Sequence, residues 1–142
     1  MLSFDHSIRK KNLEVFINSD DVEFNKLYGD CFKIKQVLVN IVSNAIKFTD
    51  EGSIDITLKT IAQNGNIMAH FIIEDTGIGI DQNEIDKIFD EFKQLDNYLI
   101  KKIKGTGLGL AIAKQLIVLL NGSIHEEVNL KRGAYSILKF HW

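Results

Sequence analysis

The chain of 142 residues carries 17 Lys and Arg residues against 19 Asp and Glu residues, so its formal net charge is −2. This near-neutral balance argues against nucleic acid as the main partner, because phosphate binding usually needs a basic excess or a basic face. The longest apolar run, Leu116 to Leu120, is far shorter than the roughly 20 residues of a membrane-spanning helix. The single cysteine, Cys31, excludes an intrachain disulfide. We expect one soluble globular domain.

The N-terminal part is expected to begin as a linker and to continue as two short strands. Residues 1–12 have no clear period, which predicts a linker or the end of an upstream helix. Residues 13–17 and 22–24 are β-type runs, and the four residues between them predict a hairpin. The globular domain is therefore expected to occupy residues 13–142.

A helix is predicted from Cys31 to Phe48, with Asp30 as its N-cap. Apolar residues recur on one face at steps of three and four: Ile34, Leu38, Ile41, Ala45 and Phe48. The opposite face carries a polar stripe with the same spacing: Lys33, Gln36, Asn40, Asn44 and Lys47. This polar stripe is either a solvated surface or one wall of a binding site.

A β-hairpin is predicted next. Residues 53–60 alternate in hydrophobicity, and Asn64-Gly65 is a typical turn leading into a second strand over residues 67–74. The hairpin ends at a loop rich in glycine, Asp75 to Ile80.

The last part of the chain is predicted to hold two helices and two strands. Asn83 to Phe92 has the pattern of a short helix, in which Phe89 and Phe92 are expected to be core anchors. Residues 93–104 are polar, basic and aperiodic. A second glycine loop at residues 105–109 leads into a helix that is expected to end near Leu120, with Asn121-Gly122 as its stop signal. Strands are expected at 123–128 and 135–140, around a turn at 131–133. This order predicts a mixed sheet with helices on one face.

Three features of the residues point to a nucleotide site. The glycine loop at 105–109 opens a helix, so its backbone N–H groups are suited to bind an anion. Asn40 and Asn44 offer neutral oxygen donors that suit Mg²⁺ shared with substrate phosphates. Asp75 ends a strand before a glycine loop, where its carboxylate can accept a hydrogen bond from the amino group of a planar base.

Four motifs in order resemble the ATP-binding catalytic domain of two-component sensor histidine kinases, a branch of the GHKL superfamily with the Bergerat fold. They are similar to the asparagine box (36–49), the first glycine box (74–80), the phenylalanine box with the start of the ATP lid (89–96), and the second glycine box (105–112). One glycine box would be weak support, whereas four motifs in order are strong. The resemblance implies an α/β (α+β) two-layer sandwich, in which a mixed, mostly antiparallel sheet of about five strands is covered on one face by three helices.

The resemblance also implies roles for individual residues, with ATP and Mg²⁺ as cofactors. Asp75 would contact the adenine amino group, and Gly77, Gly79 and Ile80 would shape the base pocket. Asn44, helped by Asn40, would hold Mg²⁺, and Lys47 would reach toward phosphate. The phosphates would be lined by Gly105, Thr106, Gly107, Leu108 and Gly109, at the end of an ATP lid at about 93–106. Lys101, Lys102 or Lys104 in the lid would neutralise charge during transfer, unless these lysines are only a solvated charge run.

Asn40 separates this chain from other members of the superfamily. Related ATPases and serine kinases carry a glutamate general base at this position, whereas an asparagine amide cannot take a proton at neutral pH. We therefore expect ATP to be kept from water and its γ-phosphoryl to be passed to a histidine on a separate dimerisation and phosphoacceptor domain, with a response regulator downstream. A non-catalytic nucleotide-binding module is the main alternative, and an ATPase or serine kinase is disfavoured by Asn40.

The phosphoacceptor histidine is expected to lie outside this chain. The family's acceptor is followed by an acidic residue and then a proline, but His6 is followed by Ser7 and the chain has no proline. The chain is therefore interpreted as the isolated catalytic domain of a sensor kinase, separate from its dimerisation and phosphoacceptor helices, and as the cytoplasmic part of a membrane-anchored protein. In one departure from the family pattern, Ala134 stands where Ser or Thr is common near the adenine.

Overall fold

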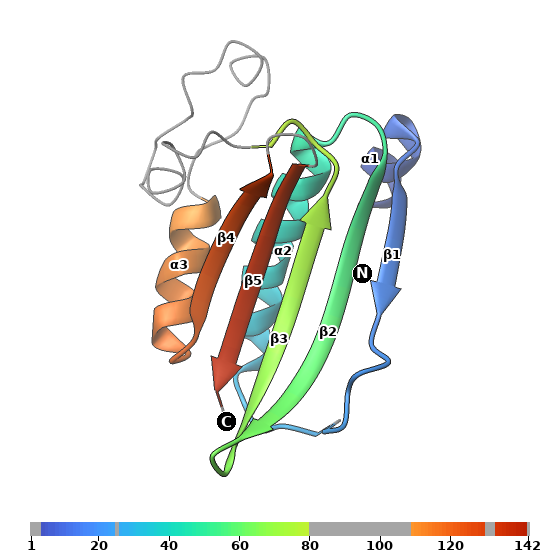
Figure 1. Cartoon of the computed structure of the whole chain (residues 1–142). Coiled ribbons are helices and arrows are strands. Elements are labelled where there is room, and N and C mark those ends of the chain that lie inside the picture. The colour runs from blue at the N-terminus through green and yellow to red at the C-terminus, as the bar shows by residue number, and fades with distance from the viewer. Residues whose placement is uncertain (1–3, 25, 80–108, 130–132, 142) are drawn as a thin grey trace.

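A computed structural model describes residues 4–24, 26–79, 109–129 and 133–141. Within these residues a single five-stranded sheet packs against helices (Figure 1). The elements in chain order are α1 (Asp5–Lys11), β1 (Glu14–Asn18), α2 (Cys31–Phe48), β2 (Ser53–Gln63), β3 (Asn66–Asp75), α3 (Gly109–Leu119), β4 (Ser123–Asn129) and β5 (Gly133–His141).

The strand order across the sheet is β1-β2-β3-β5-β4. The pair β1 and β2 is parallel, and the other three pairs are antiparallel. Helices α2 and α3 lie side by side behind one face of the sheet (Figure 1). The expected two-layer sandwich with a mixed, mostly antiparallel sheet is therefore confirmed. The short helix predicted at 83–92 lies outside the described residues.

The hairpin predicted at the N-terminus is wrong. Only β1 forms, and it pairs in parallel with β2, with Val15 opposite Ile54. Parallel neighbours need a long crossover, which α2 provides. Residues 22–24 are instead a loop fastened to β2, where the amides of Glu23 and Phe24 donate to the Thr60 hydroxyl at 2.8 and 3.1 Å.

Helix α2 has the predicted bounds and the predicted cap. The Asp30 carboxylate accepts a hydrogen bond from the Lys33 amide at 3.0 Å, which satisfies one of the free N–H groups of the first turn. Its buried face is Val37, Ile41, Ala45 and Ile46, with Ile34 and Leu38 partly buried. No helix among the described residues has the length and apolar character needed to cross a membrane.

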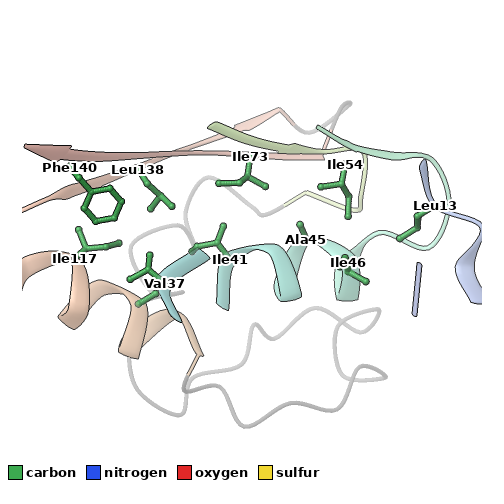
Figure 2. Packing of buried hydrophobic residues seen from close by; sticks show 11 residues of the cluster. Leu13, Val37, Ile41, Ala45, Ile46, Ile54, Ile73, Ile117, Leu138 and Phe140 are labelled. Carbon is green, nitrogen blue, oxygen red and sulfur yellow. The ribbon is translucent and has the colours of Figure 1, made fainter. Parts of the chain in front are cut away.

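The core lies between the sheet and the two long helices. In Figure 2 the side chains of Ile54, Ile73, Leu138 and Phe140 descend from the sheet onto residues of α2 and α3, among them Val37, Ile41 and Ile117. The rings of Phe71 and Phe140 meet edge to face, with 5.9 Å between their centroids. Burial of one face of α2 leaves its polar stripe outside this core, and Asn40 of this stripe lies beside Gly109 at the start of α3.

Two Asn-Gly pairs end elements where the sequence predicts that they should. Asn64 (φ 52°) and Gly65 (φ 80°) both adopt the left-handed conformation of a tight hairpin turn between β2 and β3. Asn121, also left-handed (φ 52°), terminates α3, and the following Gly122 amide donates back to the Ile117 carbonyl at 2.9 Å.

Candidate functional site

Asp75 is a buried carboxylate at the end of β3. Its side chain is held by two backbone donors, because Oδ1 accepts from the Gly77 amide at 2.9 Å and from the Ala134 amide at 3.3 Å. Burial nevertheless raises the pKa of Asp75 above its ordinary value, against the opposing effect of these hydrogen bonds and of Thr49. A carboxylate has about four lone-pair sites, so Asp75 keeps acceptor capacity for a further donor such as a base amino group.

Thr49, the C-cap residue of α2, contacts the side chain of Asp75. It is fully buried, its hydroxyl donates to the Ala45 carbonyl at 2.7 Å, and the same hydroxyl is a hydrogen-bond partner of Asp75. The hydroxyl has a single proton, so at one time it donates either to the Ala45 carbonyl or to the Asp75 carboxylate, and both acceptors lie within its reach at the last turn of α2. The position of Asp75 therefore depends on how α2 ends.

Two glycines allow the backbone to approach Asp75 closely. A Cβ at Gly77 would lie 2.5 Å from the Phe48 carbonyl oxygen, 2.8 Å from Asp75 Oδ1 and 2.9 Å from Thr49 Oγ1. Gly133, at the start of β5, has φ 90°, and a Cβ there would overlap the Asp75 carbonyl oxygen. A larger residue at either position would displace the carboxylate or its donors.

Asn40 lies on α2 against the first residue of α3. A Cβ on Gly109 would be 3.8 Å from Asn40 Oδ1, an ordinary contact distance. Within the described residues, Asn40 Nδ2 is buried and has no hydrogen-bond partner. An orphaned buried amide costs about 1 to 3 kcal/mol, which indicates that this position is built for a polar partner.

Lys47 lies on the polar stripe nearer to Asp75. Partial burial lowers its pKa, and its Nζ sits 5.0 Å from the centroid of the Phe48 ring. The ion pairs of the described residues do not include Lys47. A partly desolvated ammonium without a carboxylate partner favours binding of an anion such as phosphate.

The polar stripe of α2 connects these two ends. Asn40 precedes Thr49 by nine residues, which corresponds to about 13 Å along a helix. The partly buried Asn44 lies between them, on the same face as Asn40. The chain thus offers the Asp75 carboxylate as an acceptor for a planar base at one end of the stripe. Along α2 it offers the amide oxygens of Asn40 and Asn44 and the ammonium of Lys47. The Asn40 and Asn44 oxygens are ligands that suit Mg²⁺. The orphaned Asn40 Nδ2 is an N–H donor, which fits an acceptor such as a phosphate oxygen.

The predicted site residues divide into two groups. Asp75, Gly77 and Gly79 lie together after β3, and Gly79 has the positive φ of 70° that favours glycine. Asn40 and Gly109 lie together between α2 and α3. Asn44 and Lys47 lie on α2 between these two groups. The other predicted positions lie outside the described residues: Ile80, Lys101, Lys102, Lys104, Gly105, Thr106, Gly107 and Leu108.

Sequence reasoning missed the contacts that Thr49, Gly133 and the Ala134 amide make with Asp75, although the resemblance places Ala134 near the adenine. Thr49 stands in the asparagine-box segment, but nothing in its spacing indicated a contact with Asp75. Gly133 and the Ala134 amide approach Asp75 from β5, and the hydrogen bond from Ala134 joins residues that are 59 positions apart in the chain. The available signals were Gly133, in the predicted turn before the strand at 135–140, and the resemblance, which places Ala134 near the adenine. Ala134 contributes its backbone N–H, for which the identity of the side chain is not decisive.

Three comparisons place the chain among known proteins. Residues 29–141 match the family described as "Histidine kinase-, DNA gyrase B-, and HSP90-like ATPase". The chain is 35% identical over 130 residues to the signal transduction histidine-protein kinase BarA of Escherichia coli K12, which covers 91% of this chain but 14% of BarA. The chain therefore spans about one seventh of that relative.

Solved structures agree with this match. Full-length ShkA, crystallised with AMPPNP, aligns over 96% of this chain and 27% of its own with a TM-score of 0.81 and 27% identity. A nucleotide-free catalytic domain of the histidine kinase ThkA aligns over 97% of this chain and 86% of its own, with a TM-score of 0.73 and 31% identity. On its sequence match and its fold, the chain belongs to the histidine kinase-, DNA gyrase B- and HSP90-like ATPase family.

Proposed function

We propose that this chain binds ATP with the adenine amino group on Asp75 and the phosphates toward Asn40 and the start of α3. The observation that carries the proposal is the buried Asp75 carboxylate, which two backbone N–H groups and a glycine without room for a Cβ hold in one orientation. Gly77 and Gly79 border this base pocket. The AMPPNP bound to the related ShkA supports the choice of an adenine nucleotide.

We further propose that Asn44 and Asn40 provide oxygen ligands for Mg²⁺ and that Lys47 pairs with a phosphate. The metal would neutralise charge on the phosphates during transfer. The partly desolvated ammonium of Lys47 gains a counter-ion when a phosphate arrives, and its pKa is expected to rise on binding. Ile80, the lid lysines Lys101, Lys102 and Lys104, and the second glycine box would complete the phosphate end.

The reaction that we propose is transfer of the γ-phosphoryl to a histidine on a separate dimerisation and phosphoacceptor domain, as in two-component signalling. Asn40 supports this choice, because its amide cannot act as the general base that ATP hydrolysis needs. The relative BarA, named a histidine-protein kinase, points the same way. A response regulator would receive the phosphoryl afterwards, and the chain would be the cytoplasmic part of a larger sensor kinase, with residues 13–142 as its catalytic unit.

The test is phosphotransfer in solution. The chain is mixed with ATP labelled at the γ-phosphate and with an excess of the helical phosphoacceptor domain of BarA, and the acceptor is analysed for an acid-labile, alkali-stable phosphohistidine. We expect label on the acceptor with the wild type and with the control Asp55→Asn, which follows Ile54, the β2 residue paired with Asp75, so that its side chain alternates to the other face of the sheet. We expect none with Asp75→Asn. ATP binding without label would favour a non-catalytic module, and release of phosphate without acceptor would favour an ATPase.

A further inference from the structure

Lys11, the last residue of α1, is bound to the C-terminal end of α2. Its Nζ donates to the carbonyl oxygens of Ile46, Lys47 and Thr49 at 2.9, 2.8 and 2.9 Å. It also forms an ion pair with Asp50 at 3.2 Å. The last carbonyls of a helix lack partners within the helix and carry partial negative charge. A single ammonium with three donors therefore bonds three of the carbonyls at the C-terminal end of α2.

The one carbonyl of this turn that Lys11 does not take, that of Phe48, belongs to the base pocket. It accepts a hydrogen bond from the Ile78 amide at 3.3 Å, and it lies 2.5 Å from the position of a Cβ on Gly77. The Thr49 hydroxyl in the same turn contacts Asp75. The peptide groups of residues 46–49 are thus shared between Lys11 on one side and the base pocket on the other.

Helix α1 holds Lys11 in place by its own contacts with the domain. Phe4 and Ile8 pack against the core, and Leu13 just after the helix is buried within it. Asn12 adopts the left-handed conformation (φ 54°), so the chain turns sharply and the Leu13 amide donates to the Ile8 carbonyl at 3.0 Å. The place of the Lys11 ammonium is therefore set by the docking of α1.

We propose that Lys11 is a positioning residue for the base end of the nucleotide site. Its ammonium fixes the carbonyls of residues 46, 47 and 49, and this orientation presents the Thr49 hydroxyl to Asp75 and the Phe48 carbonyl to Ile78. The inference rests on the proposed binding of ATP. It assigns a consequence to α1, which is that withdrawal of this helix loosens the adenine contact and weakens ATP binding. The hydrogen-bond partners of Asp75 among the described residues are Gly77, Ala134 and Thr49, so the effect of α1 is indirect.

The experiment compares two nucleotides that differ only at the base. Affinities for ATP and for purine riboside triphosphate, which lacks the amino group of adenine, are measured by calorimetry for the wild type, Lys11→Met, Lys11→Arg and the exposed neighbour Lys10→Met. We expect Lys11→Met to weaken ATP binding about tenfold, as the loss of one charge-assisted hydrogen bond would. Binding of purine riboside triphosphate should weaken by less than about threefold, so that the ratio of the two affinities falls. Lys11→Arg should keep most of the wild-type discrimination between the two nucleotides, and Lys10→Met should bind both nucleotides as the wild type does.

The outcomes separate this inference from the proposed function. No ATP binding by the folded wild type would overturn both. ATP binding by the wild type with an unchanged ratio in Lys11→Met, or an equal loss for both nucleotides, would overturn the positioning role alone. If Lys11→Met does not fold, Lys11→Gln, which keeps two N–H donors on a shorter neutral side chain, is measured with the same pair of nucleotides and must show the same fall in discrimination.

Discussion

Replacement of Asp75 by asparagine should stabilise the fold and abolish ATP binding. Both backbone donors point at Oδ1, so an asparagine oxygen can accept the same bonds from Gly77 and Ala134. The shape of the pocket is then kept while the charge is removed. The amide nitrogen of the new side chain would face the adenine amino group donor to donor, so ATP would lose its partner.

The effect on stability follows from the pKa of Asp75, which burial raises above the ordinary 3.8. Between the ordinary and the raised pKa the folded state binds more protons than the unfolded state. Stability therefore falls as the pH rises through this window, and the loss persists at pH 7. Each unit of raised pKa corresponds to about 1.4 kcal/mol, and 1 kcal/mol shifts the Tm of a domain of this size by about 2 to 4 °C. We expect Asp75→Asn to raise the Tm at pH 7 by a few degrees.

The assay is thermal unfolding of the wild type, Asp75→Asn and Asp55→Asn between pH 4 and pH 8, with ATP titrations of the same samples. The Tm gain of Asp75→Asn over the wild type should shrink toward pH 4, where the wild-type carboxyl takes up its proton. Asp55→Asn, on a partly exposed carboxyl that accepts from the Ser53 hydroxyl at 3.2 Å, should keep ATP affinity. A lower Tm for Asp75→Asn at pH 7, or unchanged ATP affinity, would refute the reasoning.

Three further predictions concern the neighbours of Asp75 and the polar stripe. Gly77→Ala should lower the free energy of unfolding by about 1 to 3 kcal/mol through overpacking and weaken ATP binding, because the new Cβ would meet three oxygens within 2.9 Å. The control Gly65→Ala, in open space at φ 80°, should lower the free energy of unfolding by about 1 to 2 kcal/mol through backbone strain and leave ATP affinity unchanged. Similar ATP affinity in the two variants would contradict this prediction. Asn40→Leu should stabilise the nucleotide-free protein by about 1 kcal/mol, since it removes an orphaned amide, and should abolish the Mg²⁺ dependence of ATP binding in a titration. Lys47→Met should also stabilise the nucleotide-free protein at neutral pH, because burial lowers the pKa of the lysine and the wild type therefore gains stability only as the pH rises toward 10.5. The same variant should weaken the binding of ATP more than the binding of adenosine. Equal losses of affinity for the two ligands would argue against a phosphate contact.

Local signals in the sequence account for much of the fold. Helix α2 begins and ends where predicted, because Asp30 supplies a cap and the apolar period runs unbroken to Phe48. The Asn-Gly pairs at 64 and 121 mark their turns, since both asparagines take the left-handed conformation that few residues accept. In each case the deciding interaction joins residues that are close in the sequence.

Interactions between distant segments were not predictable in the same way. The partner of β1 is β2, which lies beyond the whole of α2, and the local pattern of residues 13–24 favoured a hairpin instead. The capping of α2 by Lys11 spans 35 to 38 residues, and no spacing rule indicates it. The residues around Asp75 come from α2, β3 and β5, so motifs identified the carboxylate but not the backbone groups that hold it.

The central claim is that Asp75 gives this chain an adenine site, and calorimetric titration of the wild type with ATP and GTP, each with and without Mg²⁺, tests it most directly. The account predicts that ATP binds, that Mg²⁺ strengthens its binding, and that GTP, which presents a carbonyl oxygen where adenine has an amino group, binds at least about tenfold more weakly. Equal affinity for ATP and GTP, or no binding of ATP by the folded chain, would contradict it.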